Sequence, residues 1–352
     1  MTRFRSTTAL AALVAVAGLA AGLAGAAPAV AEEAAPVSWS VTPADASGPD
    51  GRVAVEHEID PAASVDDQFA VRNLGAEEVT FRLAAADGFT NDNGRFDILP
   101  SDQESVDSGT WITLPESVTV APGGTAVVPF TITVPEDAQP GDHAAGITAS
   151  ILSTQQADGT GVGVESRVGF RVMTRVAGEL APAFSVQDVH ADYRLSWNPL
   201  RPGSIDVVFD VANEGNARLA VAGVLTVAGR SIAFPAEGET PQEILPGESR
   251  TISLTVPRVW PLFAFPGEIA LAPTVIDANG EPADAVPAEV APSSTDVLVW
   301  AVPWPQLLVV AGLALLVLAL LWRRGRSKRR IEALLTEARE EGRRSMAGVG
   351  QG

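Results

Sequence analysis

The heptapeptide FAVRNLG at residues 69–75 returns further along the chain as FDVANEG at residues 209–215. In both copies the Phe and the Val stand two positions apart, so they lie on one face of a strand, and the Asn and Gly that follow favour a turn. A repeated strand with its turn indicates two copies of one β fold. The repeat therefore predicts two related domains.

Three further pairs of segments follow in the same order in both copies. Pro-Gly supplies a tight turn, and a Pro directly after a strand ends that strand because it cannot donate to the ladder. The pairs are VAPG 120–123 and ILPG 244–247, FTITVP 130–135 and ISLTVP 252–257, and PG 140–141 and PG 266–267. The fold class predicted is all-β, with two immunoglobulin-like β-sandwich domains, a cleaved signal peptide and one C-terminal transmembrane helix.

Short runs rich in Val, Ile, Thr and Phe support this fold class, because they alternate with polar residues and end at Pro, Gly, Asn or Asp. Examples are residues 68–73, 78–84, 126–134, 163–174, 204–211 and 250–256. The 352 residues suffice for about two domains of ordinary size. The chain has no Cys, which excludes disulfides and cysteine-based zinc or thiol chemistry.

The N-terminus has the pattern of a secretory signal. Arg3 and Arg5 precede an apolar run at residues 9–23, and the small residues AVA at 29–31 stand before two acids. We expect cleavage after Ala31. A retained signal anchor is the alternative.

A second apolar segment, residues 297–322, holds no charged residue. Residues 304–322 alone would rise roughly 28 Å as a helix, about one hydrocarbon thickness. The segment is predicted to span a membrane. We expect five residues at its interfaces: Trp300, Trp304, Trp322, Arg323 and Arg324. The basic cluster predicts a single-pass protein of the cell membrane, with the tail in the cytoplasm and the N-terminal domains outside.

The charge of the chain is divided unevenly. The net charge is −19, yet the segment between the signal and the span holds 13 basic and 39 acidic residues and no Lys. Such a surface repels phosphate backbones, so nucleic acid is excluded as a partner. It keeps an exported protein soluble.

These features divide the chain into six parts. They are a signal peptide (1–31), a first sandwich (32–178), a second sandwich (179–278), a Pro/Ala/Glu-rich stalk (279–296), the transmembrane helix (297–322) and a basic cytoplasmic tail (323–352). The tail is predicted to begin as an amphipathic helix with Ile331, Leu334 and Leu335 on one face. Its basic start is expected to lie on anionic lipid, with a cytosolic partner as the alternative.

Catalytic residues are not evident. The three His residues are scattered, and neither an HExxH nor a GxSxG pattern occurs. The DSGT tetrapeptide at 107–110 matches aspartic proteases, but a single copy cannot supply the two carboxylates that must share a proton. We interpret it as a turn leading into Trp111. The protein is predicted to be non-enzymatic and to need no cofactor.

The loop DGFTNDNGRFD at residues 87–97 is the first candidate ligand site. It concentrates oxygen donors, which calcium prefers, although Phe89 occupies the first position of an EF-hand register. Asn-Gly at 93–94 is also a strong hairpin signal. We favour a hairpin tip that faces a ligand and leave the metal site open as the alternative. The candidate residues are Asp87, Asn91, Asp92 and Asn93.

An aromatic loop is the second candidate. The first repeat joins its Pro135 and Pro140 through the short, mostly polar segment EDAQ, whereas the second joins Pro257 and Pro266 through RVWPLFAF. Aromatic anchors on a loop are typical of binding hot spots and of membrane interfaces. Trp260, Leu262, Phe263 and Phe265 are therefore predicted to contact a partner or the membrane. The alternative is that they cap the core.

The chain resembles the WxL-interacting proteins of Gram-positive bacteria. The segments that carry the resemblance are WSVTP 39–43, FAVRNLG 69–75, TVAPG 119–123, VP 134–135 and PGDHAAGI 140–147, with a second sandwich and a span followed by basic residues. Residues 87–111 look like the version in actinobacterial surface proteins. The resemblance implies a first domain that binds peptidoglycan and a second that binds another surface protein.

The function expected on this basis is that of a membrane-anchored cell-surface protein that tethers the wall to the membrane or docks an adhesin. The alternative is a pure protein-interaction module, such as an assembly partner of a surface appendage, without wall binding.

Overall fold

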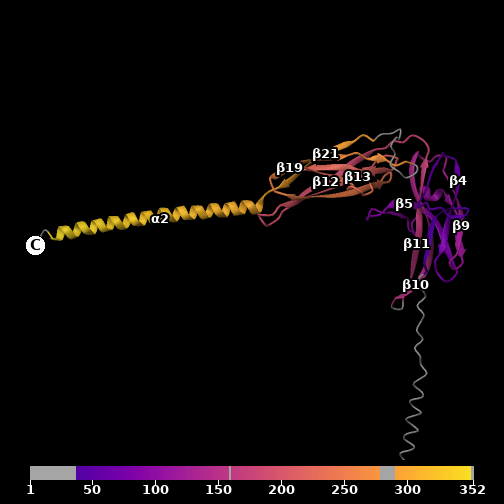
Figure 1. Cartoon of the computed structure of the whole chain (residues 1–352), viewed down its shortest axis with the longest axis horizontal. Helices are drawn as coiled ribbons and strands as arrows, with labels where there is room; N and C mark the ends of the chain where they lie inside the picture. The colour runs from indigo at the N-terminus through magenta and orange to yellow at the C-terminus, as the bar shows by residue number, and fades with distance from the viewer. Residues whose placement is uncertain (1–36, 158–159, 278–289, 350–352) are drawn as a thin grey trace, which may run out of the picture.

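The computed structural model describes residues 37–157, 160–277 and 290–349. Its strands form two β-sandwiches, and one long helix follows them (Figure 1). The predicted all-β fold class with a C-terminal helix is thus confirmed. The predicted signal peptide lies outside the described residues.

The first sandwich, domain one, consists of two sheets. One has the order β2 (Gly48–Pro49), β1 (Trp39–Asp45), β4 (Ser64–Asn73), β9 (Thr125–Thr133) and β7 (Ile112–Thr113). The other has the order β3 (Val55–Ile59), β11 (Thr160–Val176), β10 (Gly141–Ala157), β5 (Val79–Thr90) and β6 (Phe96–Ile98), with β8 (Ser117–Val120) beside β5. Neighbouring strands are antiparallel except β3 and β11, which run parallel.

The core of domain one lies between these sheets. Phe69 and Val71 of the repeat are both fully buried, as their spacing predicts. Phe69 packs against the rings of Phe130 and Phe170, with ring centroids 6.0 and 5.8 Å away. Burying several aromatic rings stabilises the sandwich without any disulfide.

The second sandwich, domain two, has one sheet of β12 (Phe184–Arg194), β13 (Gly203–Asn213) and β18 (Ser249–Val259). Opposite it lie two further sheets, of three and four strands. The first has the order β17 (Gln242–Ile244), β14 (Leu219–Val221) and β20 (Thr274–Val275). The second has the order β16 (Arg230–Phe234), β15 (Gly223–Val227), β19 (Phe263–Leu271) and β21 (Ser293–Ala301). Phe209 of the repeat is fully buried in the core between them.

The last strand of domain two differs from the sequence prediction. β21 pairs antiparallel with β19 over its whole length, from Ser293 opposite Leu271 to Ala301 opposite Phe263. Residues 293–296 therefore belong to this strand and not to a stalk, and residues 297–301 are not helical. Domain two thus extends beyond the predicted end at residue 278. The other stalk residues, apart from Val290, Ala291 and Pro292, lie outside the described part.

Hydropathy misassigned β21 for an identifiable reason. Val299 and Ala301 face the core and are buried, whereas Leu298 and Trp300 face outward and are exposed. Since both faces carry apolar residues, the alternation that marks a strand is hidden. The apolar run then merges with the helix that follows.

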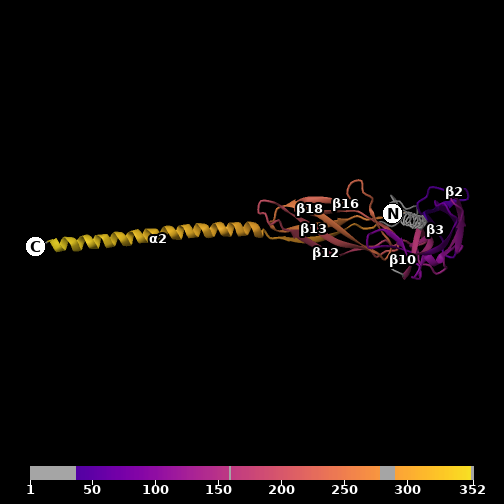
Figure 2. The same ribbon diagram turned by 90° about the horizontal axis from the view of Figure 1, so that it is seen from below.

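Helix α2 spans Trp304–Val349 (Figure 2). Within the described residues, Trp304–Arg324 is the one stretch long and apolar enough to cross a membrane, with a mean hydropathy of 2.3. The predicted tail helix is present as an uninterrupted continuation of this stretch. Trp322 lies at its far end, where Arg326 stacks over the indole ring at 4.9 Å.

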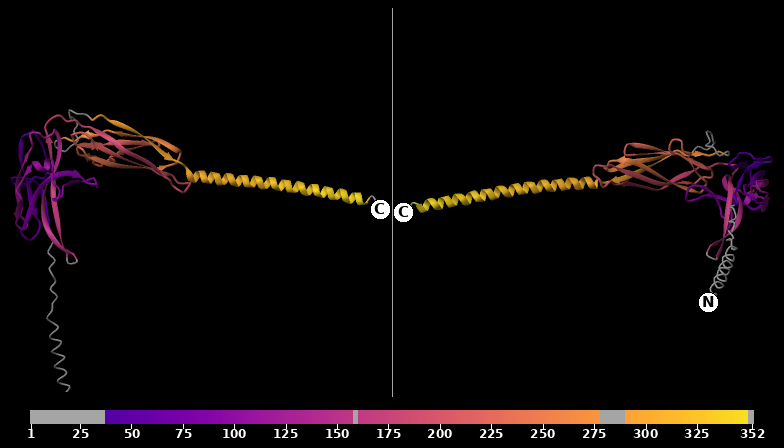
Figure 3. Two further views of the ribbon diagram at one scale, coloured as in Figure 1. Left: turned by 180° about the vertical axis from the view of Figure 1, so that it is seen from behind. Right: turned by 60° about the horizontal axis from the view of Figure 1, so that its bottom comes forward.

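The two sandwiches meet at an elbow. Domain two and α2 follow one line, and the strands of domain one run across the far end of domain two (Figure 3). Backbone contacts join the two domains at this elbow, and in one of them the Asp142 amide donates to the Asn216 carbonyl at 2.8 Å. The end of domain two that meets domain one is therefore opposite to the end where α2 begins.

Candidate binding groove in the first domain

The predicted ligand loop is a β-hairpin folded over the outer face of the second sheet. β5 pairs with β6 from Gly88 opposite Ile98 to Thr90 opposite Phe96. Two close approaches hold it there, because a Cβ on Gly88 would collide with the Phe96 ring and a Cβ on Gly146 with the Ile98 side chain. Glycine at both positions lets the hairpin side chains lie flat on the sheet.

The hairpin turn depends on Asn91. Its Oδ1 accepts hydrogen bonds from the backbone of Asn93 and Arg95, both at 3.1 Å. The Gly94 amide donates to the Asn91 carbonyl at 2.7 Å, with Gly94 at a φ of +72°. The Asn-Gly signal thus gives the turn that it predicts. Asp92 and Asn93 are exposed at the tip.

Asp87 has a structural role in this arrangement. Its carboxylate is buried and accepts the backbone N–H groups of Val106, Asp107 and Gly109 at 2.7 to 2.9 Å. These bonds fasten the loop that precedes Trp111 to the base of the hairpin. Asp87 therefore points into the protein, away from Asp92 and Asn93. Among the described residues, no group of three or more acids and His could hold a metal ion.

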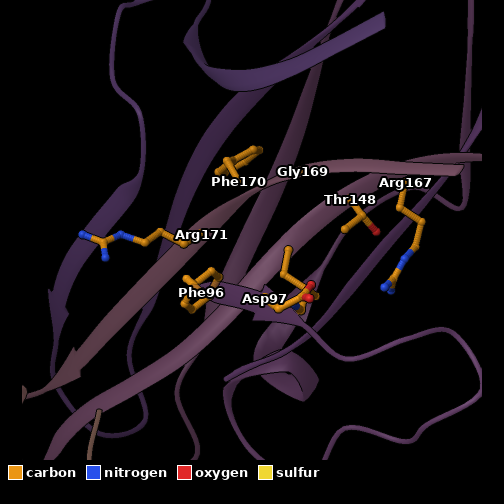
Figure 4. A pocket seen from close by; sticks show the side chains of 8 residues that line it. Phe96, Asp97, Thr148, Arg167, Gly169, Phe170 and Arg171 are labelled. Atoms are coloured by element: carbon orange, nitrogen blue, oxygen red, sulfur yellow. The ribbon is translucent and has the colours of Figure 1, made fainter. Parts of the chain in front are cut away.

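A groove runs beside this hairpin, with a cavity volume of about 310 Å³. Figure 4 shows its side chains, which come from β6, β10 and β11. It is lined by Phe96, Asp97, Ile98, Thr148, Arg167, Gly169, Phe170 and Arg171. The hairpin predicted from the sequence forms one wall of this groove.

Each end of the groove carries an arginine. Arg167 donates from Nη1 to the Leu99 carbonyl at 2.8 Å, which aligns it along the hairpin wall. Arg171 donates to Glu56 at 3.1 Å and to Glu243 of domain two at 2.8 Å. Between them lies Gly169, where a Cβ would collide with the Ile147 carbonyl and with Thr148 of β10, so glycine lets the two strands approach closely.

The groove combines three kinds of contact. Phe96 offers an aromatic wall, Asp97 and Thr148 offer a carboxylate and a hydroxyl, and Arg167 offers guanidinium N–H donors. Both Nη groups of Arg171 already donate to Glu56 and Glu243. Aromatic rings stack on sugar rings, and guanidinium groups bind carboxylates bidentately. The arrangement suits an extended polar ligand that carries rings and acidic groups.

The β11 and β10 residues of this groove were not predicted from the sequence. Arg167, Gly169 and Arg171 stand at alternate positions of one strand, so they share its outer face. Two arginines flanking a glycine on an otherwise acidic segment are a signal that could have been recognised.

Behind Arg171 lies a charge cluster between the domains. Arg218 is 1% exposed, and its Nη2 donates to Glu56 at 2.7 Å. Arg175 donates to both carboxylate oxygens of Asp142, at 2.8 and 2.6 Å. With Arg171 and Glu243 the cluster contains three cations and three anions. Burial lowers the pKa of Arg218, but its bonds to Glu56 and the charge of Asp142 outweigh this and raise it.

The DSGT tetrapeptide forms a turn, as expected. Ser108–Trp111 is a single 3₁₀ turn, η1. Asp107 accepts from His143 Nδ1 at 2.9 Å, and the His143 ring lies 4.7 Å from the Trp111 ring, centroid to centroid. Burial lowers the pKa of His143, yet the bonds to Asp107 and to the Gln139 carbonyl outweigh it and raise the pKa. When His143 is protonated, its imidazolium therefore pairs with the Asp107 carboxylate.

The aromatic loop lies at the opposite end of domain two from the groove. Trp260, Leu262 and Phe263 are exposed, whereas Phe265 is half-buried and packs against the core of domain two. The first three therefore do not cap the core. Trp300 and Trp304 are exposed at the same end.

A protein-family model matches much of domain one. Residues 58–150 match the model described as WxL Interacting Protein, peptidoglycan binding domain. The resemblance to the WxL-interacting proteins is confirmed over this segment. It includes the β5–β6 hairpin and most of β10, so one wall of the groove and Thr148 lie within the matched residues. Arg167, Gly169 and Arg171 follow it on β11.

No curated protein matches the chain significantly. Solved structures that it resembles include the Pseudomonas aeruginosa chaperone CupB2, at 13% identity and a TM-score of 0.31 over 72% of this chain and 99% of that one. The E. coli chaperone DraB is 13% identical, with a TM-score of 0.32 over 72% of this chain and 98% of that one. The class 5 fimbriae chaperone CfaA is 10% identical, with a TM-score of 0.34 over 75% of this chain and 100% of that one. Likeness at this level carries no functional information.

Proposed function

We propose that the protein is a membrane-anchored, non-enzymatic surface protein whose first domain binds peptidoglycan through the groove between the β5–β6 hairpin and β11. The observation that carries this proposal is the peptidoglycan-binding-domain match at residues 58–150, within which one wall of the groove lies. Domain one would bind the cell wall, and α2 would anchor the protein in the membrane.

The chemistry of the groove supports this ligand class. Peptidoglycan combines sugar rings with short peptides that carry carboxylates. Phe96 would stack on a sugar ring, and Arg167 would pair with a peptide carboxylate. Such local contacts answer the electrostatic difficulty, because an acidic protein would otherwise be repelled by an anionic wall.

The topology supports the anchoring. A signal-like N-terminus precedes the sandwiches, and the basic residues after Trp322 follow the positive-inside rule. We therefore place residues 32–303 outside the cell and the end of α2 inside, in the cell membrane.

The test is co-sedimentation of the full-length protein, in detergent, with insoluble peptidoglycan. Arg167→Gln and Asp97→Asn should each weaken saturable pelleting several-fold. Their matched controls are Arg95→Gln and Asp92→Asn, which change the same residue types at positions of the hairpin that do not line the groove. No pelleting by the unaltered protein across salt and calcium concentrations would overturn wall binding. Equal loss in variants and controls would remove the groove as the site.

A second role, docking of another surface protein, is favoured by one feature of domain two. β16 and β18 each lie at an end of their sheets, and a hollow of about 260 Å³ separates them. Apolar Ile232, Phe234 and Leu254 line it. An extended peptide that adds a strand to an edge and fills such a hollow is a common recognition mode.

Photo-cross-linking on whole cells tests this second role. A cross-linking residue at Ser253, exposed on β18, should capture a secreted protein. The same residue at Glu268, exposed on the central strand β19, should not. Equal capture at both positions would contradict docking at the edge.

A further inference from the structure

The end of domain two from which α2 begins gathers exposed apolar side chains. Trp197 and Leu200, between β12 and β13, are 74% and 83% exposed, and neighbouring residues of the β18–β19 loop and of β21 are at least half exposed. We call this set the apolar collar: Trp197, Leu200, Trp260, Leu262, Phe263 and Trp300. Exposed aromatic groups of this size are costly in water and need a partner.

The loops of the collar are fastened to one another and to the helix. The Tyr193 hydroxyl donates to the Val259 carbonyl at 2.8 Å and accepts from the Gly203 amide at 3.1 Å. Gln306, in the first turn of α2, donates to the Pro199 carbonyl at 3.1 Å. These bonds connect the loops of the collar to the start of α2, which leaves domain two at this end (Figure 1).

The charge of this end is the reverse of the rest of the outer segment. Residues 195–202, 258–263 and 302–306 include Arg201 and Arg258 and no Asp or Glu, although acids outnumber basic residues threefold between the signal and the span. Both arginines are exposed. A basic rim around apolar side chains matches an anionic lipid surface.

The distribution of tryptophan points to the same surface. Of the seven Trp residues, Trp39 and Trp111 pack in the core of domain one. Four others lie at this end, namely Trp197, Trp260, Trp300 and Trp304. The exposed large apolar residues of domain one, such as Leu74 and Val106, are aliphatic. Tryptophan concentrates at the headgroup level of membranes because its ring is apolar and its N–H is polar.

We propose that the apolar collar docks into the headgroup layer of the outer leaflet, around the point where α2 enters the bilayer. Lipid is the occupant that continuity favours, because the collar lies beside the start of Trp304–Arg324, the one stretch of the described residues long and apolar enough to cross a membrane. This inference rests on the membrane anchoring proposed above. It explains why Leu298 and Trp300 make the outer face of β21 apolar.

The consequence is a fixed orientation. With domain two standing directly on the lipid and no stalk beneath it, the elbow holds domain one at a set height above the membrane. The groove would then be presented to the wall in one orientation.

Fluorescence quenching by lipids tests the docking with the full-length chain. Because the protein has no Cys, Leu200→Cys and Leu262→Cys each give a single labelling site for a water-sensitive fluorophore. The labelled proteins are reconstituted into phosphatidylcholine–phosphatidylglycerol vesicles with and without bromine-labelled lipids. Leu74→Cys and Val106→Cys in domain one are the matched controls.

We expect lipid-borne bromine to quench the two collar probes several-fold more strongly than the two control probes. Equal quenching at all four sites, while alkaline carbonate fails to extract the protein, would overturn the docking and leave the anchor intact. Extraction by carbonate would overturn the anchor and the docking together. Collar probes that quench one another, and recover when diluted with unlabelled protein, would assign the surface to a second copy and overturn the lipid assignment.

Discussion

At the scale of single residues, two buried asparagines make the same network in both domains. Asn73 Nδ2 donates to the carbonyls of Glu77 and Val120, and its Oδ1 accepts from Gly75. Asn213 does the same with Ala217, Ile244 and Gly215. Each side chain joins a strand end to the turn after it and to a strand across the sandwich. The motif F-x-V-x-N-x-G is therefore a folding element, and its repetition was a sound guide to the fold.

Asn213→Ala should destabilise domain two by about 2–4 kcal/mol, because the buried carbonyls of Ala217 and Ile244 lose this donor, at roughly 1–3 kcal/mol each before relaxation. Chemical denaturation of the full-length protein in detergent measures the change. Asn93→Ala, at an exposed hairpin tip, is the control and should alter stability by less than about 0.5 kcal/mol. Equal effects of the two substitutions would contradict the structural role.

His143 predicts a pH dependence in domain one. Because its folded pKa is raised above the ordinary 6.5, the pair with Asp107 stabilises the fold fully below the unfolded pKa and loses this contribution as pH rises through the folded pKa. The melting temperatures of the wild type and His143→Gln should therefore differ more at about pH 5.5 than at about pH 9. A gap that widens with rising pH would contradict the assignment.

At the scale of elements, the position of the β5–β6 hairpin depends on missing side chains. Gly146→Val would drive a side chain into Ile98 and lift the hairpin, at a cost of about 1–3 kcal/mol. Trypsin cleavage after Arg95 should then accelerate several-fold. Adding Ile98→Ala to Gly146→Val should restore resistance by making room, and Ser117→Val on β8 should leave cleavage unchanged. Failure of that rescue would mean that the clash does not position the hairpin.

What the sequence could predict follows from how local each signal is. The hairpin at Asn93-Gly94 and the strands around Phe69 and Phe209 rest on contacts within a few residues, so their patterns are visible in the chain. β21 pairs with a strand more than twenty residues earlier, and its outward face is apolar for a reason outside the domain. The groove escaped notice because Arg167 and Arg171 meet Phe96 only through tertiary contacts.

At the scale of the whole molecule, the elbow connects the groove to domain two. Arg171 lines the groove and also donates to Glu56 and Glu243, and Arg218 bonds to the same two acids from the other domain. The Thr90 amide, next to the hairpin turn, donates to Glu248 of domain two at 2.8 Å. The relative position of the domains is therefore set by directional bonds between charges that balance.

Arg218→Met should loosen this elbow while leaving both sandwiches folded. Removing one cation leaves Glu56, Asp142 and Glu243 facing Arg171 and Arg175 alone, and breaking a buried ion pair typically costs about 3–5 kcal/mol. That cost falls on the contact between the domains, because the two cores hold none of these residues.

Spin labels at Thr125→Cys and Glu268→Cys of the full-length protein report the inter-domain distance. We expect a narrow distribution in the wild type, a broad one in Arg218→Met, and a narrow one in Arg230→Met, whose arginine bonds only within domain two. A distribution that stays narrow in Arg218→Met would mean that the backbone contacts of Asp142 and Asn216 suffice to fix the elbow.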